Sequence, residues 1–139
     1  KGGKLGKKRR IPKSESDFAP IAEEIKQEFI KKNIKFDYIH AESNGELDIK
    51  GIDFLLFYKD HIIPLQLKSF YSEEKVKKHF KRYTIPMIFI TEKAKEKNIK
   101  TATLELLDEW EKNQEKTKKL VYVINGEIKK IYYKKEPRE

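Results

Sequence analysis

Three polar side chains lie inside two otherwise apolar segments, and they are the residues best suited to chemistry. Asp53 lies in the segment 52–58, and Gln66 and Lys68 lie in the segment 62–68. A carboxylate and an amide carbonyl oxygen are hard ligands of the kind that suits Mg²⁺. A divalent ion held by them can polarise a phosphoryl oxygen and lower the pKa of a bound water molecule. A nearby lysine adds positive charge for the transition state, so these residue types suit phosphodiester hydrolysis.

Strand periodicity predicts that the three side chains meet on one patch. Both segments favour β-strands, and Lys59-Asp60 between them indicates a tight turn. A turn centred there places Asp53 directly opposite Gln66, with Cβ atoms about 5 Å apart. Because strand residues alternate between faces, Gln66 and Lys68 point the same way. A loop of odd length would break this register.

A third metal ligand is expected from the first helix of the chain. Apolar residues at helical spacing predict an amphipathic helix over residues 17–32, with Ser14 or Ser16 as its N-cap. Glu24 and Glu28 flank the apolar stripe, one turn apart on the same side. The expected metal ligands are therefore Asp53, Gln66, Glu24 and Glu28.

These residues resemble the PD-(D/E)xK nuclease superfamily. The resemblance rests on Gly51-Ile52-Asp53, twelve further residues, and an apolar-rich strand that ends in Gln66-Leu67-Lys68. It is closest to Mrr-like restriction endonuclease domains, which commonly use Gln-x-Lys. The Asp-to-Lys spacing also resembles that of archaeal Holliday junction resolvases, which have Glu where Gln66 stands. The resemblance covers about residues 18–90.

The resemblance implies a restriction-endonuclease-like fold and cleavage of DNA that depends on Mg²⁺ or Mn²⁺. It implies that Asp53 is the central metal ligand, that Gln66 takes the second position, and that Lys68 is the catalytic lysine that assists the attacking water. A helix glutamate is also implied, for which Glu24 fits better than Glu28. Gln66 stands in place of an acid, so metal affinity is expected to fall unless Glu24 compensates.

Two other classes of protein stay open beside the nuclease. Because Gln66 removes one negative charge from the site, the chain could be a catalytically inactive nucleic-acid-binding module on the same fold. A protein-interaction domain without a nucleic-acid role is the third alternative. His79 and Tyr83, one turn apart on a basic helix, either contact DNA phosphate or simply pack.

The whole chain is expected to form a single α/β domain with a central mixed β-sheet flanked by helices. The predicted order is an αβββαβ core followed by a helix and a hairpin. Glu46 and Asp48 are expected in a polar loop before the site. The expected elements are helices 17–32, 72–83 and 101–115, strands 36–39, 52–58, 62–68 and 85–90, and a hairpin of 120–124 and 128–133 around Asn125-Gly126.

Positive charge is unevenly distributed along the 139 residues. Lys and Arg number 32 against 23 Asp and Glu, a net charge of +9. Residues 1–13 contain seven of these cations and no acid, which leaves 25 cations against 23 acids in the rest. Residues 1–16 are therefore expected to be a flexible basic arm or linker. A phosphate-binding arm, a linker and a remnant of cloning are alternatives that stay open for it.

DNA is the expected partner, and two groups of cations are candidates for its phosphates. One group lies in the basic arm and the other on the helix that follows Lys68, where a merely solvated basic face is the alternative. The candidates are Lys7, Lys8, Arg9 and Arg10 in the arm, and Lys75, Lys78 and Arg82 on the helix. Nucleases that cut both strands often pair, so a homodimer is one expected assembly, and a further domain upstream of residue 1 is another expectation.

Several classes of protein are excluded by composition. No apolar run approaches the roughly 20 residues that cross a bilayer, and with no cysteine there is neither a disulfide framework nor a thiolate zinc site. His40, His61 and His79 are too scattered in the sequence for a recognisable metal cluster. No signal peptide is visible, so the cytoplasm is the expected compartment.

Overall fold

The computed structural model describes residues 11–42 and 45–134, and within these ranges the chain forms five helices and six strands. It is an α/β fold, as expected. The elements are α2 (Lys13–Lys31), β1 (Phe36–His40), α3 (Glu46–Ile49), β2 (Phe54–Tyr58), β3 (His61–Lys68), α4 (Glu73–Arg82), β4 (Met87–Ile90), α5 (Glu96–Lys112), α6 (Gln114–Thr117), β5 (Leu120–Asn125) and β6 (Glu127–Tyr132).

The six strands form one mixed sheet whose spatial order follows the chain, from β1 to β6. Strands β1, β2 and β3 are antiparallel neighbours, β3, β4 and β5 are parallel, and β6 returns antiparallel to β5. Helices α4 and α5 connect the parallel strands, as parallel pairing requires a crossover. The predicted mixed sheet with flanking helices is confirmed.

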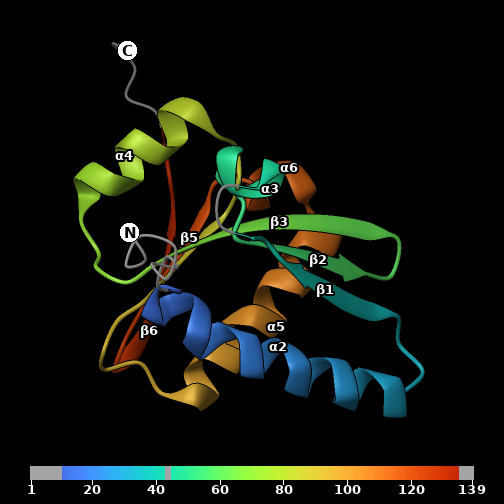
Figure 1. Cartoon of the computed structure of the whole chain (residues 1–139). Coiled ribbons are helices and arrows are strands. Elements are labelled where there is room, and N and C mark those ends of the chain that lie inside the picture. Colours follow the sequence, from blue (N-terminus) through green and yellow to red (C-terminus); the bar gives the residue numbers. More distant parts are fainter. Residues whose placement is uncertain (1–10, 43–44, 135–139) are drawn as a thin grey trace, which may run out of the picture.

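The helices cover the two faces of the sheet unequally. Helices α2 and α5 pack together over one face, and α4 lies on the other side (Figure 1). Strand β4 shows this division: Ile88 and Ile90 join the large core with α2 and α5, whereas Met87 and Phe89 join a smaller cluster with Val76 of α4. The all-apolar run is therefore buried on both faces, as its sequence predicts.

The hairpin of β2 and β3 has the predicted register. Phe54 pairs with Leu65 and Tyr58 with His61, so Asp53 is the next residue facing Gln66. Lys59 takes a positive φ of 54° in the two-residue turn with Asp60, the backbone conformation that short hairpin turns need.

Helix α2 begins earlier than the sequence predicted. It starts at Lys13 after Pro12, and neither Ser14 nor Ser16 is its N-cap. Ser14 is instead buried on the inner face of the helix, where it extends the apolar stripe by one turn. Residues 13–16, which were expected to belong to a flexible arm, are therefore the first turn of α2.

Several further elements differ from the predictions. Strand β2 begins at Phe54, so Asp53 precedes the strand in which it was expected, and β4 begins at Met87, two residues after its predicted start. Glu46 and Asp48 belong to the short helix α3 and not to a loop. Helix α5 starts at Glu96, five residues before its predicted start, because Ile99 already lies in the core. The short helix α6 was not predicted. None of the described helices has the length and apolarity to cross a membrane.

Candidate active site at the fork of the sheet

The sheet divides where β2 begins, and Asp53 lies at this fork. Residues 61–65 of β3 pair with β2, whereas Gln66, Leu67 and Lys68 pair with β4. The backbone N–H of Asp53 donates to the Leu65 carbonyl at 2.9 Å. The Leu67 N–H has no β2 strand to pair with, and it donates to the Asp53 carboxylate at 2.8 Å. The carboxyl group is thus fixed between the two strands.

Gly51 allows the chain to reach this position. Its φ is +79°, and a Cβ atom there would lie 2.7 Å from the ring of Tyr83, which directly follows α4. The glycine therefore both makes the turn out of α3 and admits the tyrosine ring. The close approach of Gly51 to the Tyr83 ring holds the segment before Asp53 against the C-terminal end of α4. This packing explains why the Gly51-Ile52-Asp53 tripeptide begins with glycine.

The pKa of the Asp53 carboxyl group is far above its usual value because the group is buried. It is 7% exposed. Burial raises its pKa to about 7, although the Leu67 N–H and the positive charge of Lys68 oppose the shift, and the negative charges of Glu15 and Asp48 add to it. Asp53 is therefore only partly ionised at neutral pH. A cation placed beside it would stabilise the ionised form.

Gln66 and Lys68 emerge on the half-buried face of β3, and His79 of α4 holds Gln66. His79 Nδ1 lies 2.6 Å from Gln66 Oε1, and His79 Nε2 lies 2.7 Å from the Ile85 carbonyl oxygen. That carbonyl can only accept, so Nε2 carries a proton and donates it. Burial lowers the pKa of His79 and favours the neutral ring. A neutral ring protonated at Nε2 leaves Nδ1 as an acceptor, which cannot bond to an amide oxygen. Turning the Gln66 amide over by 180° would bring its N–H₂ group to Nδ1 and point its carbonyl oxygen away from the histidine.

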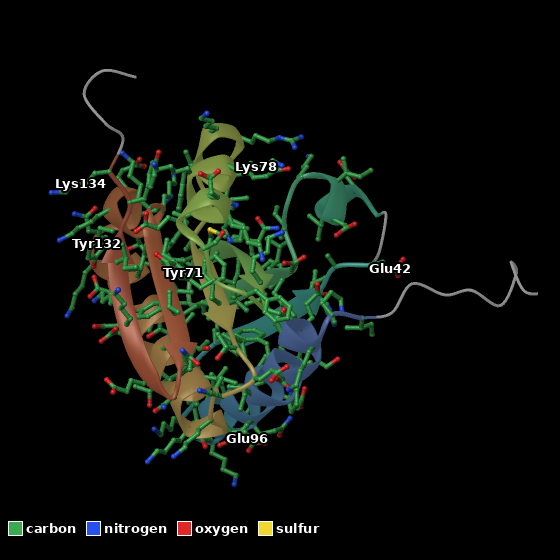
Figure 2. The ribbon with its side chains drawn as sticks, turned by 90° about the vertical axis from the view of Figure 1, so that its left-hand side faces the viewer. Glu42, Tyr71, Lys78, Glu96, Tyr132 and Lys134 are labelled. Carbon is green, nitrogen blue, oxygen red and sulfur yellow. The ribbon has the colours of Figure 1, made fainter. Side chains whose placement is uncertain are left out.

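A cavity of about 350 Å³ opens beside Gln66 and Lys68, and cations line it. Its walls include His79 and the side chains of Lys75, Lys78 and Arg82 from α4. These four cations, Lys68 included, form no ion pair within the part of the chain that the structure describes. Figure 2 shows Lys78 on α4, near the short helix α3. The structure thus brings the predicted helix cations to the edge of the site.

The two predicted helix glutamates lie elsewhere. Glu24 and Glu28 both bind the ammonium group of Lys100 on α5, Glu24 at 2.8 Å. Along the helix axis Glu24 is about 13 Å beyond Glu15, at 1.5 Å a residue. The α2 carboxylate whose negative charge raises the pKa of Asp53 is that of Glu15, so Glu15 is the better candidate on this helix, while Glu24 and Glu28 are bound to Lys100.

Glu15 is held at the site by a short chain of contacts. His40 Nε2 lies 2.7 Å from Glu15 Oε1, and the His40 ring stacks on Phe54 with centroids 4.3 Å apart. Phe18, one turn after Glu15, meets the same Phe54 ring edge-on at 4.8 Å. The first turn of α2 is therefore packed over the residue that follows Asp53.

Sequence reasoning missed Glu15 because the helix was expected to begin after it. The available signal was Pro12, since proline is common where helices start, together with the helical spacing of Ser14 to Phe18 and Ile21. His40 and His79 carried no local signal, because each is defined by partners distant in the sequence. The predicted phosphate contacts Lys7, Lys8, Arg9 and Arg10 lie outside the described residues.

The donor set suits a hard divalent cation in its chemistry. Asp53 and Glu15 supply carboxylates and Gln66 an amide oxygen. Within the described ranges, no three His, Cys, Asp or Glu side chains are grouped so that they could hold a metal ion. Mg²⁺ usually takes only one or two protein carboxylates, and completes its octahedron with water and substrate phosphate. Two carboxylates and an amide oxygen are therefore enough in number and kind.

Comparison with protein-family models, with curated proteins and with solved structures finds no match to this chain. The case for a function therefore rests on the residues and the geometry of this fork.

Proposed function

We propose that this chain is a divalent-metal-dependent endonuclease that hydrolyses phosphodiester bonds of DNA. The observation that carries the proposal is the fork itself, where the Asp53 carboxylate accepts from the backbone N–H of Leu67, between Gln66 and Lys68, beside a cavity whose cations form no ion pair among the described residues. The order of elements supports a restriction-endonuclease-like fold: a helix, three antiparallel strands, a helix and a parallel strand. This is the arrangement that the resemblance to PD-(D/E)xK nucleases implies.

In the proposed site, Asp53, Glu15 and the Gln66 carbonyl oxygen, once the amide is turned away from His79, would hold Mg²⁺ or Mn²⁺. The ion, when bound, would polarise the scissile phosphate and lower the pKa of a water molecule. Asp53 would then be held in its ionised form. The Leu67 N–H orients its carboxylate, and His79 orients the Gln66 amide.

Lys68 and the cavity cations act on the nucleic acid. Lys68 lies two residues after Gln66 on the same face of β3. In the proposed mechanism its ammonium group would assist the attacking water and stabilise charge on the phosphate. Lys75, Lys78 and Arg82 line the adjoining cavity and would bind neighbouring phosphates. The DNA backbone would thus pass between β3 and α4.

Cleavage assays test the proposal. Supercoiled plasmid, branched and methylated DNA are incubated with Mg²⁺ or Mn²⁺ and the wild-type chain, Asp53→Asn or Lys68→Ala. We expect each substitution to lower the cleavage rate by at least about 100-fold. Lys130→Ala, which changes a lysine on the opposite side of the molecule, is the control and is expected to cut normally. A wild-type chain that cuts none of these substrates would refute the proposal, as would full activity of Asp53→Asn and Lys68→Ala.

Paired substitutions on α2 test which glutamate belongs to the site. Glu15→Gln is expected to weaken Mn²⁺ binding about tenfold or more, because it removes a carboxylate next to Asp53. Glu24→Gln removes the same charge from the same helix but is bound to Lys100, and we expect no change. Isothermal titration calorimetry measures both. The opposite ranking would return the role to Glu24.

The alternative is a catalytically inactive nucleic-acid-binding module on this fold. The observation that favours it is Gln66, a neutral side chain where the resembled resolvases have an acid. In that case the chain would bind DNA in a salt-dependent way without measurable Mn²⁺ affinity. Gln66→Glu separates the two functions, because restoring the charge should create metal binding in a module that lacks it.

A further inference from the structure

Phe70 is an exposed aromatic side chain beside the candidate site. It lies two residues after Lys68, in the connection from β3 to α4, and its exposed fraction is 66%. This is the largest exposed fraction of any aromatic side chain in the described part of the chain. The position matters because Lys75, one of the cations that line the cavity, contacts it.

The connection is built so that Phe70 points outward. Tyr71, its neighbour, packs edge-on against Phe89 of β4 with ring centroids 5.1 Å apart. Ser72 accepts a hydrogen bond from the Lys75 N–H and caps α4. Tyr71, although 36% exposed, is thus anchored on the sheet and α4 begins directly afterwards, whereas the Phe70 ring stays on the surface.

Lys75 joins this ring to the cavity. Its ammonium group donates to the Phe70 carbonyl at 2.8 Å and lies 5.5 Å from the centre of the Phe70 ring. The same side chain lines the cavity that contains Lys68. An aromatic face and a cationic channel thus lie side by side, which is the combination that proteins use to bind single-stranded nucleic acid.

We propose that Phe70 is a stacking site for an unpaired nucleobase, so that the substrate is DNA with single-stranded or branched segments. This inference rests on the proposed DNA role of the site. A base in intact duplex is stacked on both sides by its neighbours and offers no free face, whereas an unpaired base does. If phosphates of the DNA strand lie in the cavity, a neighbouring unpaired base of that strand would stack on the Phe70 ring.

The surrounding charge favours nucleic acid over a second copy of the chain as the occupant. In a symmetric dimer the same surface patch faces itself. The Phe70 rings could then meet only by bringing Lys68, Lys75 and Lys78 of both copies together, and such like-charge contacts oppose association. A polyanion is attracted by the same cations.

Binding measurements on the full chain test this inference without any need for cleavage. Fluorescence anisotropy in EDTA compares a labelled 20-nucleotide single strand, a splayed duplex and a blunt duplex of the same sequence. Phe70→Ala should weaken binding to the first two about tenfold and leave the blunt duplex within about twofold, because stacking acts on unpaired bases. Phe70→Trp should retain the affinity of the wild type.

Ile62→Ala is the matched control, since Ile62 is a similarly exposed apolar residue (58%) near the other end of β3. It should change none of the three affinities. Equal loss on all three DNAs, or no loss with Phe70→Ala, would overturn the stacking site while the nuclease proposal stands on its own cleavage assay. A Phe70→Ala effect that follows a change of oligomeric state in light scattering would assign Phe70 to self-association instead. Absence of any DNA binding by the wild type would overturn the inference together with the DNA role.

Discussion

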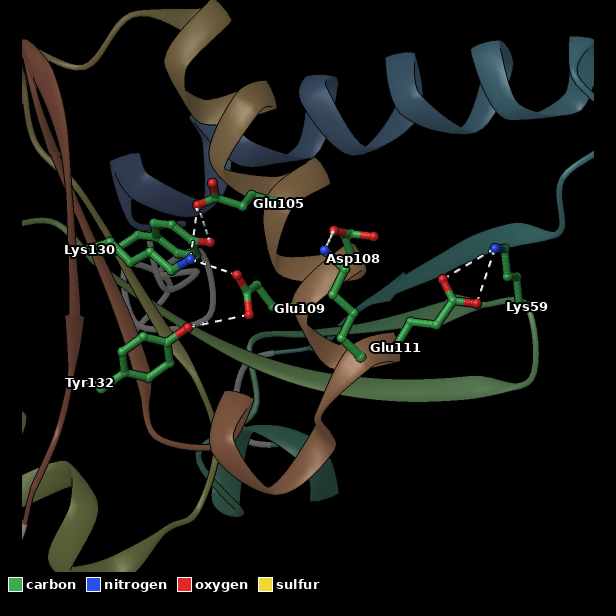
Figure 3. Close-up of polar contacts among 9 residues, drawn as sticks. Lys59, Glu105, Asp108, Glu109, Glu111, Lys130 and Tyr132 are labelled. Atoms are coloured by element: carbon green, nitrogen blue, oxygen red, sulfur yellow. Dashed lines mark hydrogen bonds and ion pairs between the residues drawn. The ribbon is translucent and has the colours of Figure 1, made fainter.

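The lysines near α4 and the lysines near α5 have opposite surroundings. On the α5 side, Lys130 binds Glu109 at 2.7 Å and lies 3.6 Å from Glu105, and Lys59 binds Glu111 at 3.1 Å (Figure 3). Around α4, by contrast, the cations that line the cavity have no carboxylate partner within the described part of the chain. Total lysine content is therefore a poor guide to function, because a lysine paired with a carboxylate has less charge to offer an anion than the cavity cations, which form no ion pair among the described residues.

Two carboxylates show the same contrast. The Lys130 ammonium lowers the pKa of Glu109, whereas burial raises the pKa of Asp53 to about 7. Glu109 is neutralised by a side chain of the protein itself. Asp53 is buried, and within the described residues its carboxylate accepts one hydrogen bond, from the Leu67 N–H. An external cation would be stabilised in this environment.

The largest expected effect is an opposite pH dependence of stability for these two carboxyl groups. The pKa of Asp53 is higher in the folded chain than in the unfolded chain. As pH rises from 4 to 7, the Asp53 carboxyl group therefore loses its proton in the unfolded chain before it does so in the folded chain. Stability from this group is thus present at acid pH and lost on the way to neutrality, by about 1.4 kcal/mol per pH unit at the steepest. Asp53→Asn should therefore be more stable than the wild type at pH 7 and equal to it near pH 3.5. Urea denaturation measures the difference.

Glu109→Gln is expected to change stability in the opposite direction in the same experiment. The pKa of Glu109 is lowered in the fold, so its contribution is present above its ordinary pKa and lost as pH falls. The substitution should cost stability at pH 7 and nothing at low pH. If Asp53→Asn behaved in the same way as Glu109→Gln, the contrast between a buried and a paired carboxylate would be wrong.

Charge reversal on the two sides is the next largest effect. Lys78→Glu combined with Arg82→Glu should weaken DNA binding about 100-fold at low salt and lower the slope of log K against log salt by about two. Lys59→Glu combined with Lys112→Glu makes the same change in net charge on the α5 side. It should leave the affinity within a few-fold. Equal losses would mean that only net charge matters.

Gly51 and Gly126 both have a positive φ, and only Gly51 is packed against another side chain, so alanine substitutions at the two positions distinguish the effect of packing from that of backbone strain. Gly51→Ala should lower the free energy of unfolding by more than 2 kcal/mol, because it adds a contact with Tyr83 to the strain of its φ. Gly126→Ala has a similar φ of +82° with open space around it, and should cost about 1–2 kcal/mol. Chemical denaturation gives both values, and equal costs would mean that the Tyr83 contact is unimportant.

A double-mutant cycle tests how His79 holds Gln66. Gln66→Leu and His79→Phe should each destabilise the fold, and their effects should be less than additive by about 1 kcal/mol, because each leaves the other's polar group unsatisfied. Stability by urea denaturation is the measurement. Additive effects would show that the 2.6 Å contact contributes nothing.

The smallest effect is expected on the α5 side. Lys130→Ala removes an ion pair at the surface and should cost about 0.2–1 kcal/mol. High salt should reduce that difference, since exposed pairs are screened. DNA affinity should not change, and a measurable loss of affinity would mean that the paired lysines also take part in binding.

Much of the fold could be predicted from local patterns. The β2–β3 register followed from two apolar runs around Lys59-Asp60, and the buried strand β4 followed from an unbroken apolar segment. The α4 boundaries followed from Ser72 as N-cap with two acids after it. These features depend on residues that are near one another in the chain, so periodicity and capping express them directly.

The start of α2 and the identity of its glutamate could not be predicted in the same way. Ser14 has the residue type of an N-cap, but tertiary packing buries it inside the helix. Which glutamate approaches Asp53 depends on how α2 lies across the sheet, and that angle is set by Phe18 against Phe54 and by Lys100 between Glu24 and Glu28. Both contacts join residues that are distant in the sequence.

By itself, the sequence determined that Asp53 lies opposite Gln66, with Lys68 on the same strand face as Gln66, because strand alternation and a two-residue turn fix that register. Only the tertiary structure decided the surroundings that make this patch a candidate site. Burial of Asp53, the hold of His79 on Gln66, the approach of Glu15 and the exposure of Phe70 all arise from packing between separate elements. Desolvation and charge act through space, and the order of residues along the chain does not report them.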